Sequence, residues 1–160
     1  MSHFTQYNQL MTVHYFAYGS NMDPDRMIER RAFFTDRVFA RLENYKLVFN
    51  KISNKNPEEG FGNIIPDGNS VVEGVLYEVE WDAIECLDIK EGYPAAYSRE
   101  EIEVELSDGG KVEALVYIAR EDKTRDGLKP SREYLSHYLK GKDLLSEEYY
   151  SWLETIETFD

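Results

Sequence analysis

A short apolar and aromatic run, Val13 to Tyr18, stops abruptly at Gly19-Ser20-Asn21. Such a run predicts a strand that is buried on both faces. Asp23-Pro24 then predicts the start of a helix, because Asp is a favoured N-cap and proline at the first helical position lacks an amide hydrogen that would have no partner there. A small-residue turn before a helix gathers outward-facing amides, which suit an anion or a carbonyl oxygen. The same residues also suit a tight connection without a ligand.

The composition indicates a single globular domain. The chain has 160 residues, of which 42% are hydrophobic, and this length can bury a core without disulfides or metals. We expect a loosely held leader at residues 1–12 and one domain over residues 13–160. The 12 tyrosines are many for this length. Tyrosine has an apolar ring and a polar tip, so these residues suit either a half-wet cavity or strand edges.

The charge balance argues against polyanionic partners. The formal net charge of −13 would repel nucleic acid and anionic membrane surfaces. The single cysteine, Cys86, excludes an intrachain disulfide and favours a reducing, cytoplasmic location. Its acidic surroundings favour a small core residue over an activated thiolate. The first 12 residues lack the basic and apolar regions of a secretory signal, and no run approaches the ~20 apolar residues of a membrane span.

The remaining pattern predicts the α+β class, with a small mixed, curled sheet or barrel of about six strands and short flanking helices. The segment 38–50 suits either one long bent strand or two strands at a corner. Asp67-Gly68-Asn69 has turn chemistry, and Gly74 is compatible with a bulge. Further strands are expected at 60–66, 71–79, 98–106 and 111–119.

Apolar residues at helical spacing predict the helices. In the first of them we expect Met27 and Ile28 to face inward and Arg26 and Arg30 to face outward. Gly92 is expected to stop the second. The expected helices are 23–31, 81–90, 131–139 and 146–158.

Three segments resemble the gamma-glutamylcyclotransferase family. Residues 15–21 resemble the family's signature loop, in which a strand runs into a Tyr-Gly-Ser-Asn turn. Residues 87–94, followed by Tyr97-Ser98-Arg99, resemble a second element in which Glu91 matches the catalytic glutamate. Residues 130–134, with Gly141 behind them, resemble a third. The resemblance extends from about Val13 to about Gly141 and implies a small barrel.

The resemblance also implies a reaction and a site. The alpha-amine of a gamma-glutamyl compound would attack its own side-chain amide carbonyl and release 5-oxoproline and a free amine or amino acid. Glu91 would act as general base and then as general acid. Taken alone, Glu91 also suits a surface carboxylate or a helix-terminal acid. The substrate-binding residues implied are Tyr15, Phe16, Ala17, Tyr18, Gly19, Ser20, Asn21, Tyr97 and Tyr134.

Several alternatives stay open. The leaving group is an amino acid, an amine or an acyl group on a carrier protein. The same fold would also serve as a non-catalytic module that binds a small gamma-glutamyl or amino-acid ligand, and the acidic surface would suit an interaction protein. The three histidines, His3, His14 and His137, show no metal-ligand spacing, and phosphate-loop patterns are absent, so we expect no metal and no cofactor. The oligomeric state, a homodimer included, is not determined by these patterns.

Overall fold

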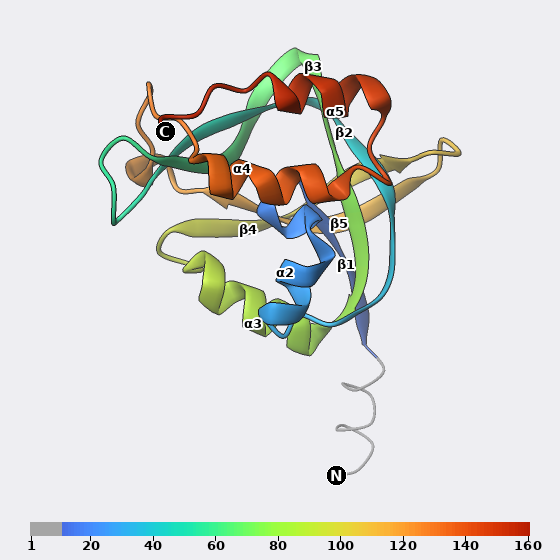
Figure 1. The fold of residues 1–160 in the computed structure, drawn as a ribbon. Coiled ribbons are helices and arrows are strands. Elements are labelled where there is room, and N and C mark those ends of the chain that lie inside the picture. The colour runs from blue at the N-terminus through green and yellow to red at the C-terminus, as the bar shows by residue number, and fades with distance from the viewer. Residues whose placement is uncertain (1–10) are drawn as a thin grey trace.

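In the computed structural model, which describes residues 11–160, the chain forms a closed five-stranded barrel (Figure 1). The strand order is β1-β3-β2-β4-β5, and β1 closes the barrel by pairing in parallel with β5 at Tyr15 and Leu115. The α+β prediction is confirmed, with five strands rather than about six. The strands are β1 Thr12–Ala17, β2 Phe34–Ile52, β3 Gly60–Glu80, β4 Tyr97–Leu106 and β5 Lys111–Ala119.

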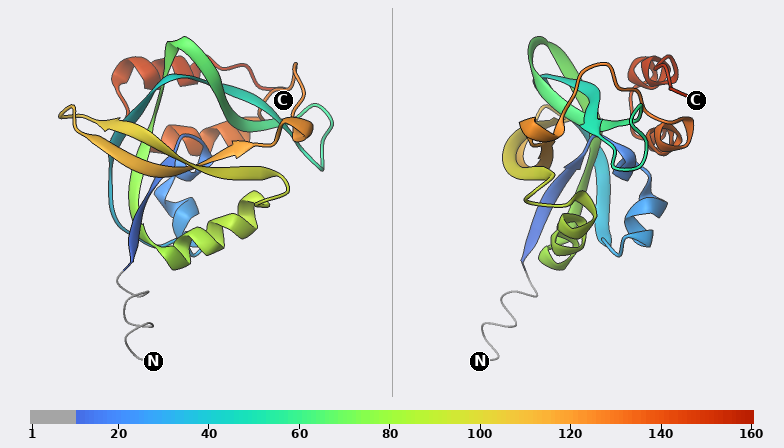
Figure 2. Two further views of the ribbon diagram at one scale, coloured as in Figure 1. Left: turned by 180° about the vertical axis from the view of Figure 1, so that it is seen from behind. Right: turned by 90° about the vertical axis from the view of Figure 1, so that its left-hand side faces the viewer.

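Short helices flank the barrel on one side and at one end. Figure 2 shows α2, α4 and α5 along one side of it and α3 at one end. Ser131 and Ser146 cap α4 and α5 with their hydroxyls, and α5 ends earlier than the apolar spacing suggested. The helices are η1 Ser20–Met22, α2 Pro24–Glu29, α3 Trp81–Glu91, η2 Glu121–Lys123, α4 Arg132–Tyr138, η3 Leu139–Gly141 and α5 Glu147–Glu154.

Strand β3 is continuous where the sequence indicates two strands and a turn. The turn chemistry is present, because Ser70 Oγ donates to Asp67 Oδ2 at 2.6 Å. The turn bends β3 without ending it. β3 pairs with β2 both before and after the turn, and the register shifts between the pairs Tyr45–Pro66 and Glu43–Val71. Strand β2 is accordingly one long strand, the first of the two arrangements that its sequence allows.

Gly74 does not mark a bulge, since it pairs in register with Ala40. A Cβ on Gly74 would lie 2.4 Å from the Ala17 carbonyl oxygen and 2.9 Å from the Phe16 ring. The glycine therefore lets β1 approach β3 closely.

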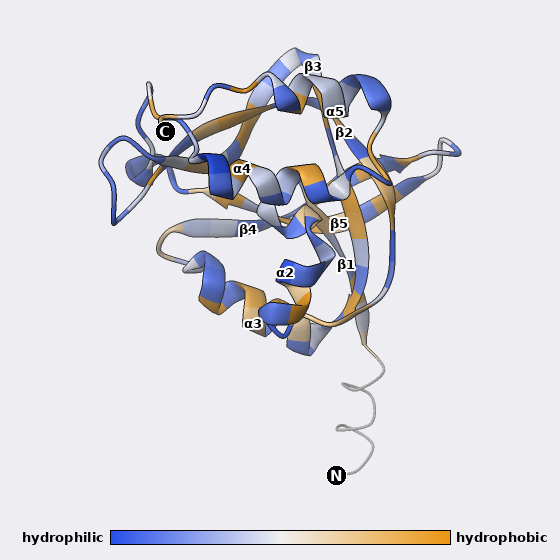
Figure 3. Ribbon diagram, in the orientation of Figure 1, coloured by the Kyte–Doolittle hydropathy of each residue, from blue (hydrophilic) through white to orange (hydrophobic). Residues whose placement is uncertain are grey.

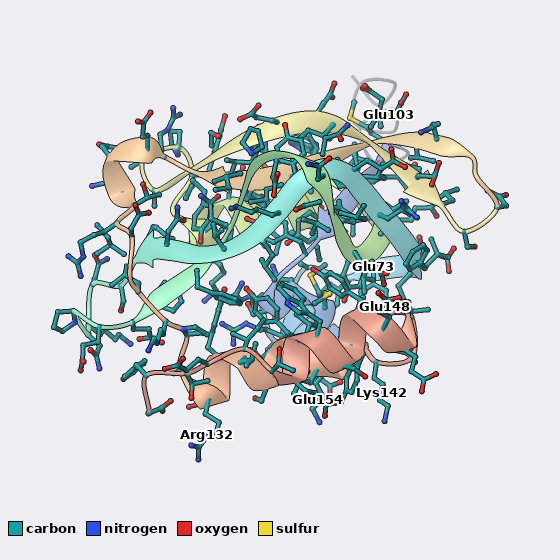
Figure 4. All side chains as sticks on the ribbon, turned by 90° about the horizontal axis from the view of Figure 1, so that it is seen from above. Glu73, Glu103, Arg132, Lys142, Glu148 and Glu154 are labelled. Atoms are coloured by element: carbon teal, nitrogen blue, oxygen red, sulfur yellow. The ribbon has the colours of Figure 1, made fainter. Side chains whose placement is uncertain are left out.

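The hydrophobic core fills the barrel and extends beneath the helices. Hydrophobic and hydrophilic residues alternate along the strands (Figure 3). Met27 is fully buried as expected, whereas Ile28 is 50% exposed, so the prediction for Ile28 was wrong. Cys86 is only partly buried on α3. Charged side chains such as Glu103 and Arg132 lie at the edges of the molecule (Figure 4).

The leader expected at residues 1–12 lies mostly outside the described residues, and Thr12 already opens β1. No helix within residues 11–160 is long and apolar enough to cross a membrane. The same part of the chain contains no group of His, Cys, Asp and Glu side chains that could hold a metal ion.

Candidate active site

A cavity of about 320 Å³ lies where the end of β1 meets η1, α2 and the end of α3. This volume suits a small-molecule ligand. Its wall combines residues that are far apart in the sequence: the turn at Gly19, the carboxylate of Glu91, and the rings of Tyr97 and Tyr134. The barrel thus brings the three resembling segments to one place.

The turn after β1 presents unpaired amides. The amides of Met22 and Asp23 donate back to the carbonyl oxygens of Gly19 and Ser20 and start the helical turns. Within the described residues, the amides of Gly19, Ser20 and Asn21 have no acceptor, as expected for the first positions of a helix. Three donors that line a cavity provide a site for a carboxylate or an oxyanion.

The Asn21 side chain and carbonyl hold the turn in place. Asn21 Nδ2 donates to the Tyr15 hydroxyl at 2.9 Å, and the Tyr77 hydroxyl donates to the Asn21 carbonyl at 2.6 Å. Arg30 Nη1 donates to Asn21 Oδ1 at 3.1 Å. Because Tyr15 and Arg30 are held in the cavity wall and Tyr77 is buried in the core, the turn is fixed before any ligand binds.

Glu91 is the last residue of α3, which extends one residue beyond the expected range of 81–90. Gly92 follows with φ of 69° and ends the helix in the left-handed conformation that glycine adopts readily. Glu91 Oε1 lies 3.7 Å from Arg30 Nη1, and 20% of its side chain stays exposed. Burial raises the pKa of the Glu91 carboxyl above its ordinary value, while Arg30, Arg26 and Lys51 oppose that rise. A carboxyl with a raised pKa is suited both to accept a proton and to return it.

Three cationic side chains line the cavity and were missed as site residues. Arg26 and Arg30, expected to face outward, lie in the wall, so that prediction was wrong. Their spacing of four positions does place them on one helix face, but polar residues facing a cavity and polar residues facing solvent give the same pattern. Lys51 comes from the far end of β2. On a chain with net charge −13, three cations around one carboxylate mark the cavity as a site for an anionic ligand.

Two tyrosines form hydrogen bonds with the backbone of Gly62, which has no paired residue on β2. The Tyr134 hydroxyl accepts from the Gly62 amide at 2.9 Å, and the Tyr97 hydroxyl donates to the Gly62 carbonyl at 2.8 Å. Burial raises the pKa of both hydroxyls, so both stay protonated. The two rings therefore line the cavity while their hydroxyls secure β3.

Tyr18 also lines the cavity, but its hydroxyl donates to the Tyr117 carbonyl at 2.6 Å. The Tyr18 hydroxyl is therefore engaged within the barrel, and only the ring faces the cavity. Phe16 and Ala17 do not line the cavity: they are 0% and 1% exposed and belong to the barrel core. Phe16 points to the opposite side of β1 from Tyr15, as alternation along a strand requires.

The comparisons with known proteins agree with this geometry. The family described as gamma-glutamyl cyclotransferase, AIG2-like, matches residues 15–136. This chain belongs to that family. The matched range of this chain includes the turn after β1, Glu91 and Tyr134.

Individual family relatives are similar over most of their length. The chain is 29% identical to the mouse (Mus musculus) gamma-glutamylcyclotransferase over 149 residues, which cover 89% of this chain and 78% of that protein. A solved gamma-glutamyl cyclotransferase structure superposes with a TM-score of 0.85 at 26% identity, covering 94% and 90% of the two chains. An uncharacterised human protein superposes with a TM-score of 0.82 at 27% identity, covering 93% and 90%. The barrel is thus the fold of the gamma-glutamyl cyclotransferase family.

Replacing Tyr97 or Tyr134 by phenylalanine is expected to lower the free energy of unfolding by about 1–3 kcal/mol, because each change leaves a buried backbone group of Gly62 unpaired. KM should rise more than kcat falls if the rings only help to bind the substrate. Urea unfolding and steady-state kinetics test both points. Tyr150 is a matched control, because its hydroxyl makes no hydrogen bond within residues 11–160. Variants that are as stable as Tyr150→Phe would contradict the structural part of the prediction.

Proposed function

We propose that this protein is a gamma-glutamylcyclotransferase that closes a gamma-glutamyl group onto itself and releases 5-oxoproline. The observation that carries the proposal is Glu91, a single carboxylate with a raised pKa in a cationic cavity beside three unpaired turn amides. Family membership supports the class of chemistry. The assignment of roles to this chain's residues is our inference.

The cavity offers a partner for each polar group of the gamma-glutamyl moiety. The substrate alpha-carboxylate would pair with Arg26, whose Nε is buried without a partner in the described residues. The alpha-ammonium would face Glu91. The gamma-carbonyl oxygen would face the amides of the turn. Held in this folded shape, the amine and the carbonyl lie close together, which removes much of the entropic barrier to ring closure.

Glu91 would then handle the protons. Its carboxylate takes a proton from the ammonium, and the free amine attacks the gamma-carbonyl carbon. The turn amides stabilise the oxyanion that forms. Glu91 returns its proton to the departing nitrogen as the carbon–nitrogen bond breaks. The regenerated carboxylate then takes the second proton of the ring nitrogen, which leaves a neutral lactam, and passes it to the released amine, which departs as an ammonium ion. Arg30 contacts both Glu91 and Asn21 and would hold the Glu91 carboxylate in a fixed position relative to the turn.

The deciding experiment measures 5-oxoproline release from a panel of gamma-glutamyl dipeptides and gamma-glutamylamines. Release from any of them supports the proposal, and the preferred substrate identifies the leaving group. If the protein binds a gamma-glutamyl compound but never releases 5-oxoproline, a binding module becomes the better description. If it neither binds nor converts any of them, the proposal fails.

The activity should also depend on pH in a defined direction. Because burial raises the pKa of Glu91, kcat/KM should fall on the acid side with an apparent pKa above the ordinary value for glutamate. Below that pKa the carboxyl is already protonated and cannot accept the substrate's proton. A pH–rate profile of the wild type tests this expectation. An acid limb at or below the ordinary glutamate pKa would argue against Glu91 as the base.

A further inference from the structure

Three side chains from two helices form a hydrogen-bonded chain behind the cavity. Asp23 caps α2, and His137 lies on α4, which packs against η1 above α2 (Figure 1). His137 Nδ1 lies 2.8 Å from Asp23 Oδ2, and its Nε2 lies 3.3 Å from Arg26 Nη1. The Asp23 and His137 side chains are only 8% and 24% exposed, so the chain is largely shielded from water.

The partners fix the state of the imidazole. An ionised aspartate only accepts hydrogen bonds, so it requires a proton on Nδ1. Arginine only donates, so it requires a bare lone pair on Nε2. The neutral imidazole with its proton on Nδ1 meets both demands. The other neutral tautomer would direct an N–H at the guanidinium.

Arg26 is the member of this hydrogen-bonded row that faces the cavity. It lines the cavity wall, and its Nε is buried without a hydrogen-bond partner in residues 11–160. Its Nη1 is held from behind by His137, which leaves the remaining donors for a ligand. A guanidinium held in this way binds a carboxylate with less loss of side-chain entropy.

We propose that His137 is a positioning residue, which accepts a hydrogen bond from Arg26 and holds the guanidinium at the cavity wall while Asp23 fixes the tautomer. The tautomer and the position of Arg26 are properties of the fold. The consequence for the substrate alpha-carboxylate rests on the proposed function. The sequence pattern gave no role to any of the three histidines, because the contact joins residues more than one hundred positions apart.

Asp23→Asn tests the hydrogen bonds from Asp23 through His137 to Arg26 with little change in side-chain shape. Asp23 Oδ1 accepts from the Asp25 amide at 3.0 Å, and asparagine retains this cap. The new amide NH2 would then face His137 Nδ1 and demand a lone pair there, so the proton moves to Nε2 and opposes Arg26. We expect ¹⁵N NMR to show Nδ1–H on His137 in the wild type and Nε2–H in the variant. KM for the best gamma-glutamyl substrate should rise about tenfold with kcat changed less. Asp25→Asn, which changes the neighbouring exposed acid, is the matched control.

Two substitutions of His137 separate positioning from packing. His137→Phe keeps a ring but removes donor and acceptor, so KM should rise about as much as in Asp23→Asn. His137→Gln supplies an NH2 group as donor and a carbonyl oxygen as acceptor, and it should restore most of the affinity. Equal KM values in wild type and His137→Phe, or Nε2–H in the wild type, would overturn the proposal. The NMR measurement needs no turnover, so an inactive protein with the expected tautomers would refute the proposed function and leave the positioning chain intact.

Discussion

Glu91→Gln is expected to lower turnover of gamma-glutamyl substrates by at least ~10²-fold and up to ~10⁴-fold, the usual contribution of a general acid–base group. Glutamine keeps the shape of the side chain but cannot take the ammonium proton, so the substrate amine stays protonated and cannot attack. Binding should survive in part, because the turn amides and the cationic side chains do not depend on Glu91. Release of 5-oxoproline measures turnover, and ligand titration measures binding.

The same substitution should not unfold the protein. Burial raises the pKa of the Glu91 carboxyl, so the folded state holds this proton more tightly than the unfolded chain does. The contribution of Glu91 to stability is therefore fully present below its unfolded-state pKa and is lost as the pH rises through its folded-state pKa. Glutamine does not titrate. At neutral pH, Glu91→Gln should melt at the same or a higher temperature than the wild type, with a smaller difference in acid.

Glu85→Gln is the matched control, because Glu85 is an exposed acid on the same helix. It should leave turnover and melting temperature nearly unchanged. Wild-type turnover in Glu91→Gln would refute the catalytic assignment. A loss that appears equally in Glu85→Gln would point to the helix or to net charge rather than to proton transfer.

The parts of the fold that follow local rules could be predicted from the sequence. Asp23-Pro24 starts a helix, and Gly92 ends one, because capping and a left-handed φ depend only on neighbouring residues. The β4–β5 hairpin follows from clean alternation and from the turn at 107–110. Tertiary pairing decided β3 instead: Asp67-Gly68-Asn69 forms local hydrogen bonds, yet β2 holds the strand together around them.

The walls of the cavity could be predicted only in part. Residues 15–21 and Glu91 were identified by their resemblance to a family pattern, and the barrel brings most of them to one cavity. Arg26 and Arg30 were not identified, because amphipathic spacing marks a polar face without saying what it faces. Lys51 and His137 act across long sequence separations, and no local pattern contains that information. Phe16 was included only because it lies within the signature segment.

Gly62→Ala is expected to lower the free energy of unfolding by about 3 kcal/mol, the upper end of the range for overpacking. A Cβ on Gly62 would lie 2.1 Å from the Tyr138 hydroxyl oxygen and 3.2 Å from the Tyr134 hydroxyl oxygen. Tyr138 is 0% exposed, so its ring cannot turn away into solvent. Urea unfolding measures the loss. Gly68→Ala on the same strand is the control, because a Cβ there meets nothing within 4 Å.

Tyr138→Phe should rescue part of that loss. It removes the oxygen that the new methyl group would strike, at the expense of one hydrogen bond at 3.1 Å to the Tyr134 hydroxyl. Gly62→Ala combined with Tyr138→Phe should therefore be more stable than the sum of the two single changes predicts, by about 1 kcal/mol or more. Strict additivity of the two unfolding free energies would show that the strain lies in the backbone of β3 and not in the contact with Tyr138.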